Sequence, residues 1–535
     1  MKIKLTTCFL LCFQFVLFAQ QDAWVYLKDK QNVADAIANP ITILTQNAID
    51  RKNTHGVAID ERDVPVNENY MSQLKSATGI LVKAKSKWLN AVHVRGSQND
   101  IEALINLDFV VSIDFADKSL NTSKTAKQKT VSKLENVDVA FNYGSASNQI
   151  EMIKGDKLHL QDYTGLGMTV AVLDAGFPNV NTIGGFKRLR DAGRILGTYD
   201  FVDRDTNVYS NTTSNHGTLV LSTMAGYIEN QFVGTAPDAS YYLFVTEDGF
   251  NENPVEESYW VEAAERADSL GVDVINSSLG YGSFYDNPNY NYPASSYDGN
   301  TAYITKGANI AFEKGLLIVN SAGNEGTAGI NAPADAVGVF SIGAVNASGN
   351  YASFSSRGNS YQPTQKPDVV AQGQNSYVIT ENNSVATANG TSFSSPIMAG
   401  GIVCLWQALP NKSNVEIMQL VRESASQYNN PDNYLGYGIS NLEMALNSVI
   451  GNSNESTFEE IVLYPNPSNN IVYVGLPENT NIVSIRLFDF LGRKVNDFSI
   501  SNEYNSIDVS SLSSGLYIAR IESGNEVKAI KLIKK

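Results

Sequence analysis

One serine of this chain stands where a nucleophile would be activated. Ser392 follows the small lead-in Gly390-Thr391 and precedes a long apolar run, residues 397–408. That run is too long for a strand and predicts a buried helix, with Pro396 in its first turn. The start of a helix carries positive partial charge, which stabilises an alkoxide or an oxyanion. A serine that only caps a core helix has the same local pattern, so the choice depends on a partner base.

The candidate bases are four histidines, all of which precede Ser392. They are His55, His93, His159 and His216. This order excludes the Ser–Asp–His arrangement of the α/β-hydrolases. His216 is the best base, because it opens an apolar segment of helical length. Asp174 is the best orienting acid, because it ends the apolar run 169–173 and so lies where open α/β sheets bind ligands. The order Asp174, His216, Ser392 predicts a catalytic triad with the chain order of subtilisin.

Four motifs in this order resemble the subtilisin-like (subtilase) serine peptidases. They are Asp174-Ala175-Gly176, Asn215-His216-Gly217-Thr218, Ser321-Ala322-Gly323-Asn324-Glu325-Gly326 and Asn389-Gly390-Thr391-Ser392-Phe393-Ser394-Ser395-Pro396. The resemblance implies a serine endopeptidase in which Asn324 donates a hydrogen bond in the oxyanion hole. It also implies that Ser278, Leu279 and Gly280 bind the substrate backbone and wall the primary specificity pocket, facing Ala322 and Gly323.

A triad of this kind needs no metal ion and no organic cofactor for any step. The carboxylates of Asp203 and Asp205 suit structural calcium, but a pair of this kind is more often a solvated turn. The segment 226–234 is also shorter than the usual calcium loop of the family. The sequence therefore predicts no required cofactor, with calcium as the alternative at these two carboxylates.

The peptidase motifs lie in the middle of 535 residues, a length that predicts about three domains. Residues 1–19 combine an early basic end with an apolar stretch and predict a secretory signal peptide. Residues 20–117 alternate strand and helix patterns, which predicts an α+β unit. Its position resembles that of the subtilase pro-domain, which templates folding and blocks the cleft; an accessory binding domain is the alternative. Residues 118–144 predict an exposed linker, and we expect the pro-segment to be cut between residues 117 and 148.

Residues 145–450 predict the domain that positions the triad. Buried strand patterns alternate there with helical patterns, which indicates a doubly wound, mostly parallel α/β sheet with helices on both faces. In such a sheet Asp174 ends a strand, while His216 and Ser392 open helices.

The last region, residues 456–535, consists of short alternating strands and predicts a small β-sandwich. It closely resembles the C-terminal sorting domain of the type IX secretion system of Bacteroidetes-type bacteria. The motifs are Tyr464-Pro465-Asn466-Pro467, Leu491-Gly492-Arg493, the run 513–521 and the basic end 531–535. The resemblance implies export through that machinery, followed by release or attachment at the cell surface. A carbohydrate- or protein-binding module is the alternative.

The net charge of −16 argues against nucleic acid and anionic membrane surfaces as partners. Beyond the signal peptide, no apolar run reaches the length of a membrane span. The predicted partners are therefore peptide substrates, the chain's own pro-domain and the secretion machinery. Two other functions stay open on the sequence: a catalytically silent surface-binding or adhesion protein on a subtilase scaffold, and a specialised peptide-maturation protease.

Overall fold

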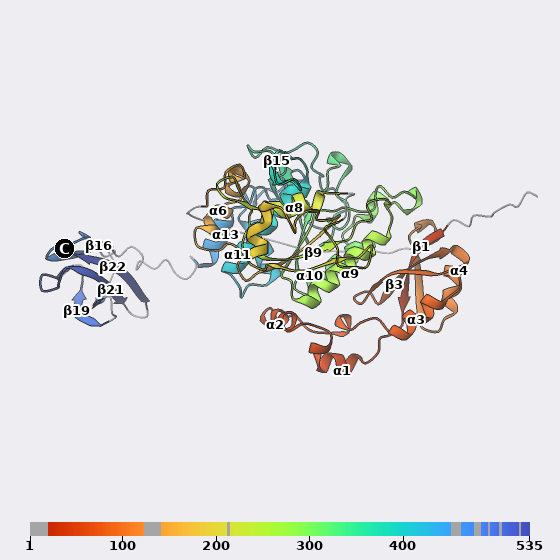
Figure 1. Cartoon of the computed structure of the whole chain (residues 1–535), viewed down its shortest axis with the longest axis horizontal. Helices are drawn as coiled ribbons and strands as arrows, with labels where there is room; N and C mark the ends of the chain where they lie inside the picture. Colours follow the sequence, from red (N-terminus) through yellow and green to blue (C-terminus); the bar gives the residue numbers. More distant parts are fainter. Residues whose placement is uncertain are drawn as a thin grey trace, which may run out of the picture. The chain divides into compact units, whose positions relative to one another are not determined.

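The computed structural model describes residues 20–121, 141–210, 214–450, 462–475, 483–489, 493–501, 505–523 and 526–535. The predicted signal peptide and residues 122–140 of the predicted linker lie outside these residues. The chain divides into two units, residues 1–448 and 449–535 (Figure 1). The first unit contains the predicted pro-domain and the predicted peptidase domain.

A seven-stranded parallel sheet forms the centre of the peptidase domain. Side by side, its strands are β13 (Val369–Gln372), β12 (Val339–Val345), β11 (Leu317–Ser321), β10 (Val274–Ser277), β5 (Thr169–Asp174), β9 (Ser240–Val245) and β6 (Ile195–Asp200). Most of these strands are apolar runs buried along their whole length, as expected for a sheet covered on both faces. From β5 the chain adds β6 and β9 on one side and β10 to β13 on the other, so the strand order reverses beside β5. The predicted doubly wound α/β fold is confirmed.

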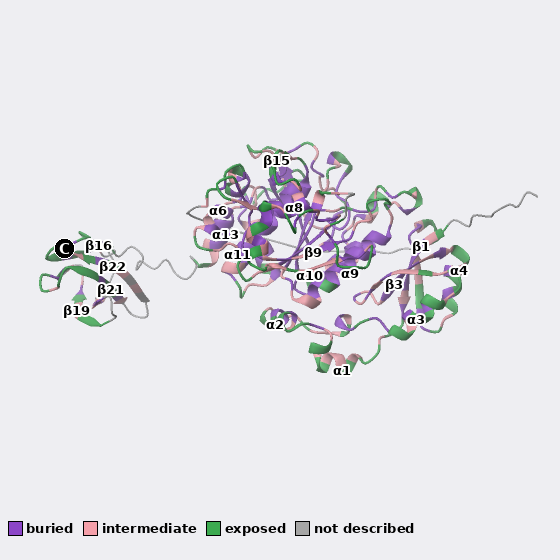
Figure 2. Cartoon of the chain, in the orientation of Figure 1, coloured by how far each residue is buried: buried purple, intermediate pink, exposed green. Residues whose placement is uncertain are grey.

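Helices cover both faces of this sheet (Figure 1). On one side α8 (His216–Ala225) packs against α11 (Thr391–Ala408), and α11 also contacts strands β10 to β13. On the other side α9 (Val255–Leu270) packs against α10 (Tyr303–Glu313). Two further helices, α12 (Asn414–Glu423) and α13 (Leu442–Ile450), end the domain. The buried residues concentrate in the sheet and in the helices beside it (Figure 2).

The N-terminal region forms an antiparallel sheet with helices, as the α+β prediction requires. Its strands lie in the order β2 (Leu81–Ser86), β3 (Ala91–Ser97), β1 (Gln20–Leu27) and β4 (Val110–Phe115), with α3 (Glu68–Ser76) and α4 (Gln98–Ala103). Alternate residues of β1 pack in two different hydrophobic cores. Ala23 and Val25 pack in the core of this domain, whereas Trp24 stacks on Tyr303 of α10, with ring centroids 4.5 Å apart. The pro-domain sheet therefore docks one face on α9 and α10.

Two helices of the pro-domain were not predicted. They are α1 (Val33–Ala38) and α2 (Gln46–Thr54), and both lie between β1 and α3. The sequence of α2 has no apolar stripe, because two of its three buried positions hold Arg51 and Lys52. A search for hydrophobic periodicity cannot find a helix whose buried face is charged.

The C-terminal unit is built from two antiparallel sheets. One contains β16 (Val462–Tyr464), β17 (Ile471–Gly475) and β20 (Ser506–Asp508); the other contains β19 (Lys494–Ile500), β18 (Val483–Asp489), β21 (Gly515–Ser523) and β22 (Glu526–Lys534). Apolar residues from both sheets, such as Val472 and Ile485, share one buried cluster. The predicted β-sandwich is confirmed.

Candidate active site

The candidate residues gather at the carboxyl edge of the parallel sheet, where the strand order reverses. Asp174 is the last residue of β5, Ser278 follows β10 directly, and Ala322 follows β11 directly. These three strands are neighbours, so their carboxyl ends bring the three segments together. The predicted substrate-binding residues 278–280 and 322–323 thus lie on adjacent strand ends beside Asp174.

Asp174 and His216 form a hydrogen-bonded pair. The carboxylate of Asp174 is completely buried, and its Oδ1 contacts His216 Nδ1 at 2.8 Å and accepts the N–H of Ala175 at 2.8 Å. His216 is the first residue of α8, and its side chain is 30% exposed. Burial lowers the pKa of this imidazole, but the charge and the hydrogen bond of Asp174 outweigh burial, so the pKa is raised above its usual 6.5.

Ser392 is the second residue of α11, where the predicted helix dipole acts. The imidazole of His216 lies beside this turn, with its ring centroid 6.0 Å from that of Phe393. Ser392 Oγ donates to the carbonyl of Ser278 at 3.4 Å, and within the described residues no hydrogen bond joins it to His216. Catalytic hydrogen bonds often form only when substrate binds. The structure thus brings the three side chains together with the Asp–His contact formed and the Ser–His contact open.

Two nitrogen atoms that could donate hydrogen bonds lie near Gly390, next to Ser392. The side-chain Oδ1 of Asn324 accepts the N–H and the hydroxyl of Thr391, at 2.9 and 3.1 Å. These donors assign the oxygen of the amide and leave Nδ2 for another partner. A methyl group on Gly390 would lie 3.6 Å from both Asn324 Nδ2 and the N of Ser392. Gly390, at φ 147°, therefore leaves the space beside both nitrogen atoms free of a side chain.

Thr391, which orients Asn324, was not singled out from the sequence. The sequence did contain a signal for this role, because a hydroxyl side chain directly before the candidate nucleophile is able to hydrogen-bond to a residue at a neighbouring strand end. Its contact with Asn324 joins residues that are 67 positions apart, and sequence spacing alone does not predict such a pairing.

The first turns of α11 lack one helical hydrogen bond. In an α-helix the carbonyl of Ser392 would accept the N–H of residue 396, but Pro396 has none. The prediction that Pro396 lies in the first turn is wrong, because the helix already begins at Thr391 and the proline is inside it. The hydroxyl of Ser278 donates to the carbonyl of Ser392 instead, at 2.9 Å. The hydroxyl of Ser278 thus replaces the missing helical hydrogen bond at the carbonyl of the candidate nucleophile.

The predicted substrate-binding segments are held by further polar contacts. The side chain of Asn320 donates to the carbonyl of Leu279 at 3.0 Å. Gly280 is exposed, and a methyl group there would touch Asn331, whose side chain lies 3.5 Å away. Ala322 is buried and Gly323 is half-buried. The two segments therefore present backbone at the strand ends, with Asn331 beside Gly280.

Turn contacts involve one of the two carboxylates proposed as calcium ligands, Asp205, and the neighbouring Asp200. Asp200 Oδ1 accepts the N–H groups of Val202 and Asp203, and Asp205 Oδ1 accepts the N–H of Asn207. Calcium takes six to eight oxygen ligands. In the described part of the chain, no group of three or more His, Cys, Asp or Glu side chains is placed to hold a metal ion. Calcium at Asp203 and Asp205 stays a prediction.

Comparison with known proteins identifies the family of the central domain. Residues 165–438 match the model of the subtilase family. The chain belongs to the subtilase family. This subtilase is 31% identical to Subtilisin E of Bacillus subtilis (strain 168) over 330 residues, which cover 60% of this chain and 76% of Subtilisin E. It is 28% identical to an alkaline protease of Alkalihalobacillus alcalophilus over 316 residues, covering 58% and 72% of the two chains. It is thus a subtilisin-like serine endopeptidase.

A solved structure shares the fold of this subtilase. The epidermin leader peptide processing serine protease (EpiP) of Staphylococcus aureus aligns with a TM-score of 0.53 at 16% identity, covering 80% of this chain and 98% of EpiP. At this identity the match shows the fold alone.

The flanking regions match families of their own. Residues 22–133 match the peptidase S8 propeptide domain of Bacteroidota, and residues 462–535 match the secretion system C-terminal sorting domain. Both predicted resemblances are confirmed, and the sorting domain indicates export to the cell surface or the medium. Among the described residues, no helix has the length and apolar character needed to cross a membrane.

Proposed function

We propose that this subtilase hydrolyses peptide bonds through a covalent acyl-enzyme, with Asp174, His216 and Ser392 as its triad. The observation that carries the proposal is the joint placement of three groups at the carboxyl edge of the sheet. They are the buried Asp174–His216 pair, the helix start that presents Ser392, and the amide of Asn324 near the N of Ser392. Acyl transfer needs these groups close together, and their approach from segments far apart in the chain supports the proposal.

The roles of the residues follow from their positions. His216 Nε2 takes the proton of Ser392 Oγ as the oxygen attacks the carbonyl carbon of the peptide. Asp174, bound to Nδ1, holds the imidazole and stabilises its positive charge. The oxyanion accepts hydrogen bonds from Asn324 Nδ2 and the N–H of Ser392. His216 then gives its proton to the leaving amine. Water attacks the resulting ester with His216 again as base, which releases the acid and restores Ser392. No step requires a metal ion or a cofactor.

Substrate selection in this proposal rests mainly on backbone. An extended peptide between residues 278–280 and 322–323 would pair with their main-chain groups, which gives affinity with little dependence on sequence. Protein and peptide substrates are therefore the proposed partners of the cleft. The pro-domain precedes the peptidase domain, and the chain is proposed to be made as a zymogen.

Digestion of an unstructured protein such as casein tests the function. We expect the matured wild-type protein to cut internal peptide bonds, and the Ser392→Ala protein, matured by an added protease, to cut none, with new chain ends identified by mass spectrometry. If neither protein cuts any bond, the silent surface-binding protein becomes the better account. Cleavage of the substrate protein at only one site would favour a specialised maturation protease.

The pKa of His216 sets the pH dependence of the reaction. Only neutral imidazole accepts the proton of Ser392, so kcat/KM rises with pH as His216 loses its proton. Because the pKa is raised above 6.5, we expect the midpoint of the acid limb above pH 6.5. Initial rates on a short peptide substrate between pH 5 and about pH 9 measure it. A midpoint below 6.5 would contradict the assignment of His216 as a base paired with Asp174.

The contact between Ser278 and Ser392 predicts a coupled pair of substitutions. Ser278→Ala leaves the carbonyl of Ser392 without a donor, and we expect the rate of labelling by a serine-reactive fluorophosphonate to fall about tenfold. Pro396→Ala in the Ser278→Ala background supplies the missing helical N–H, so most of the rate should return. Pro396→Ala alone should change the rate by less than about threefold.

The comparison separates positioning of Ser392 from binding of the substrate. The labelling reagent makes no peptide-like contacts with residues 278–280, so a defect in substrate binding would raise KM without slowing the labelling. If Pro396→Ala does not recover the labelling rate of Ser278→Ala, Ser278 does not act through the carbonyl of Ser392.

A further inference from the structure

One segment of the pro-domain packs against the peptidase domain instead of its own sheet. This segment, here called the strap, comprises residues 44–64 and includes α2. Its backbone runs close to the ends of two peptidase helices: the N–H of Thr45 donates to the carbonyl of Ser269 at 3.0 Å. Apolar strap residues, among them Leu44 and Ala48, are buried. The strap is a contact separate from the docking of the pro-domain sheet on α9 and α10.

Two glycines of the peptidase domain make room for the strap. Gly271 ends α9 and Gly315 follows the end of α10, at φ 84° and 86°. A methyl group on Gly271 would lie 2.7 Å from the backbone N of Ala48, and one on Gly315 would lie 2.9 Å from Val57. Glycine is favoured at such helix ends for its positive φ, and here it also allows the strap to approach closely.

The strap lies on the edge of the sheet opposite to the candidate active site. Gly271 and Gly315 lie shortly before β10 and β11, whereas the candidate substrate-binding segments follow the same strands. His55 of the strap lies beside Trp406, with ring centroids 5.4 Å apart, near the last residue of α11. Ser392 is near the first residue of that helix, and the 14 positions from Ser392 to Trp406 correspond to about 21 Å. The strap therefore binds far from the cleft.

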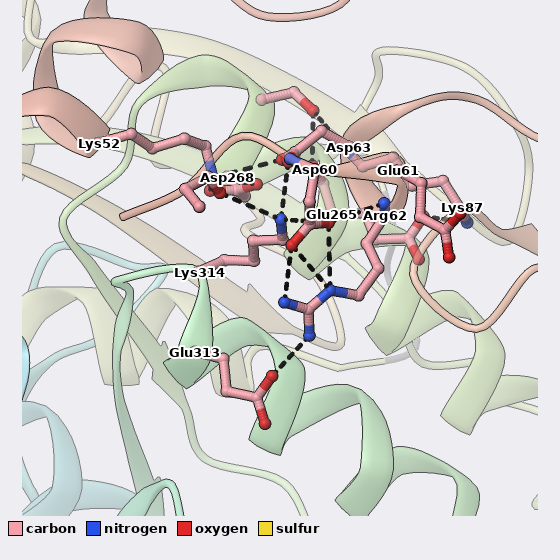
Figure 3. Close-up of polar contacts among 12 residues, drawn as sticks. Lys52, Asp60, Glu61, Arg62, Asp63, Lys87, Glu265, Asp268, Glu313 and Lys314 are labelled. Atoms are coloured by element: carbon pink, nitrogen blue, oxygen red, sulfur yellow. Dashed lines mark hydrogen bonds and ion pairs between the residues drawn. The ribbon is translucent and has the colours of Figure 1, made fainter. Parts of the chain in front are cut away.

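Buried charges alternate between the strap and the peptidase domain (Figure 3). Lys52 of the strap binds Asp268 of α9 at 2.8 Å, and Asp63 of the strap binds Lys314 at 2.6 Å. Lys52 and Asp63 also face each other at 3.3 Å. All four side chains are at most 1% exposed. Arg51 of the strap also binds Asp268, at 2.5 Å. Among the described residues, the ion pairs of Asp268 and Lys314 are all with the strap, so each of these two peptidase charges depends on the pro-domain for its partner.

We propose that the strap is a second docking site, which holds the pro-domain on the peptidase domain after the linker has been cut. Loss of one partner from a buried hydrogen-bonded charge pair mainly accelerates dissociation. Two separate contacts also let either one re-form while the other holds, which slows release further. Maturation would then require removal of the strap itself, in addition to the cut in the linker. This goes beyond the proposed zymogen, in which only a block of the cleft is implied.

The test measures release of the cut pro-segment from the full chain. The chain carries Ser392→Ala, which removes any dependence on its own peptidase activity, and a recognition sequence for a site-specific protease inserted among residues 122–140. After the cut, native mass spectrometry following dilution gives the rate at which the pro-segment leaves. We expect it to stay bound in the parent and to leave at least about a hundredfold faster in Lys52→Met.

Two further variants make the result specific. Asp268→Asn removes, from the peptidase side, the charge that Lys52 and Arg51 share and should accelerate release at least as much, which a folding defect of the pro-domain would not explain. Lys85→Met removes an exposed ion pair with Glu68 inside the pro-domain and should change the rate by less than about threefold. If the cut pro-segment leaves Lys52→Met and Asp268→Asn no faster than it leaves the parent, the strap is not a docking site.

Discussion

Replacement of Ser392 by alanine is expected to lower kcat for peptide hydrolysis by about 10⁶, the loss known for the same change in subtilisin. The methyl group leaves no oxygen to attack the carbonyl, while the Asp174–His216 pair and Asn324 stay in place. Residual hydrolysis would come from a water held near His216 and from the two oxyanion donors. The measurement is kcat on a peptide substrate with protein whose pro-segment has been removed by an added protease.

The matched control is Ser394→Ala. Ser394 is a buried serine of the same helix turn, and its hydroxyl donates to the carbonyl of Thr391 within the helix. Its removal tests the effect of losing a hydroxyl from α11 without touching the candidate nucleophile, so kcat should stay within about tenfold of the parent. Equal losses in both variants would show that the helix, and not the Ser392 oxygen, determines the rate.

Asp174→Asn is expected to lower kcat by about 10⁴, the size found for the equivalent change in other Ser–His–Asp enzymes. The amide keeps the shape of the carboxylate but loses the charge that stabilises the imidazolium. Because Asp174 is completely buried, no solvent replaces that charge. The loss corresponds to about 5.5 kcal/mol in the activation free energy.

The same variant has a second, independent signature in its pH profile. The charge and hydrogen bond of Asp174 raise the pKa of His216, whereas burial lowers it. With the charge removed, the lowering by burial remains, so the acid limb of the residual activity should move to lower pH. A loss of kcat with the limb unchanged would mean that Asp174 acts on stability and not on His216.

The sequence predicted the elements around the triad well, because each carries its own local signal. The run ending at Asp174 is a buried parallel strand, and the structure ends β5 there. The helix α9 and the strand β12, Val255–Leu270 and Val339–Val345, belong to the alternating strand and helix patterns predicted for this domain. In the pro-domain, the side chain of Ser97 caps α4 by accepting the N–H of Asp100. These features depend on residues close in the chain, which is where pattern arguments are strongest.

The features that were missed depend on contacts between distant parts of the chain. The charged face of α2 becomes a buried face only because Asp268 lies opposite, 216 positions further on. Likewise, Pro396 is tolerated inside α11 because Ser278, 114 positions before Ser392, donates to the Ser392 carbonyl the hydrogen bond that the proline cannot. The orientation of Asn324 by Thr391 is of the same kind. No local pattern encodes such pairs.

Covalent labelling tests the central claim most directly. The protein is produced as the full chain, and its pro-segment is then removed by an added protease. The matured protein is treated with a serine-reactive fluorophosphonate and digested, and the modified residue is mapped by mass spectrometry. We predict a single adduct on the Oγ of Ser392, which disappears in His216→Ala under the same conditions because no base remains to activate the oxygen. An unlabelled protein, or an adduct on a serine other than Ser392, would contradict the proposed triad.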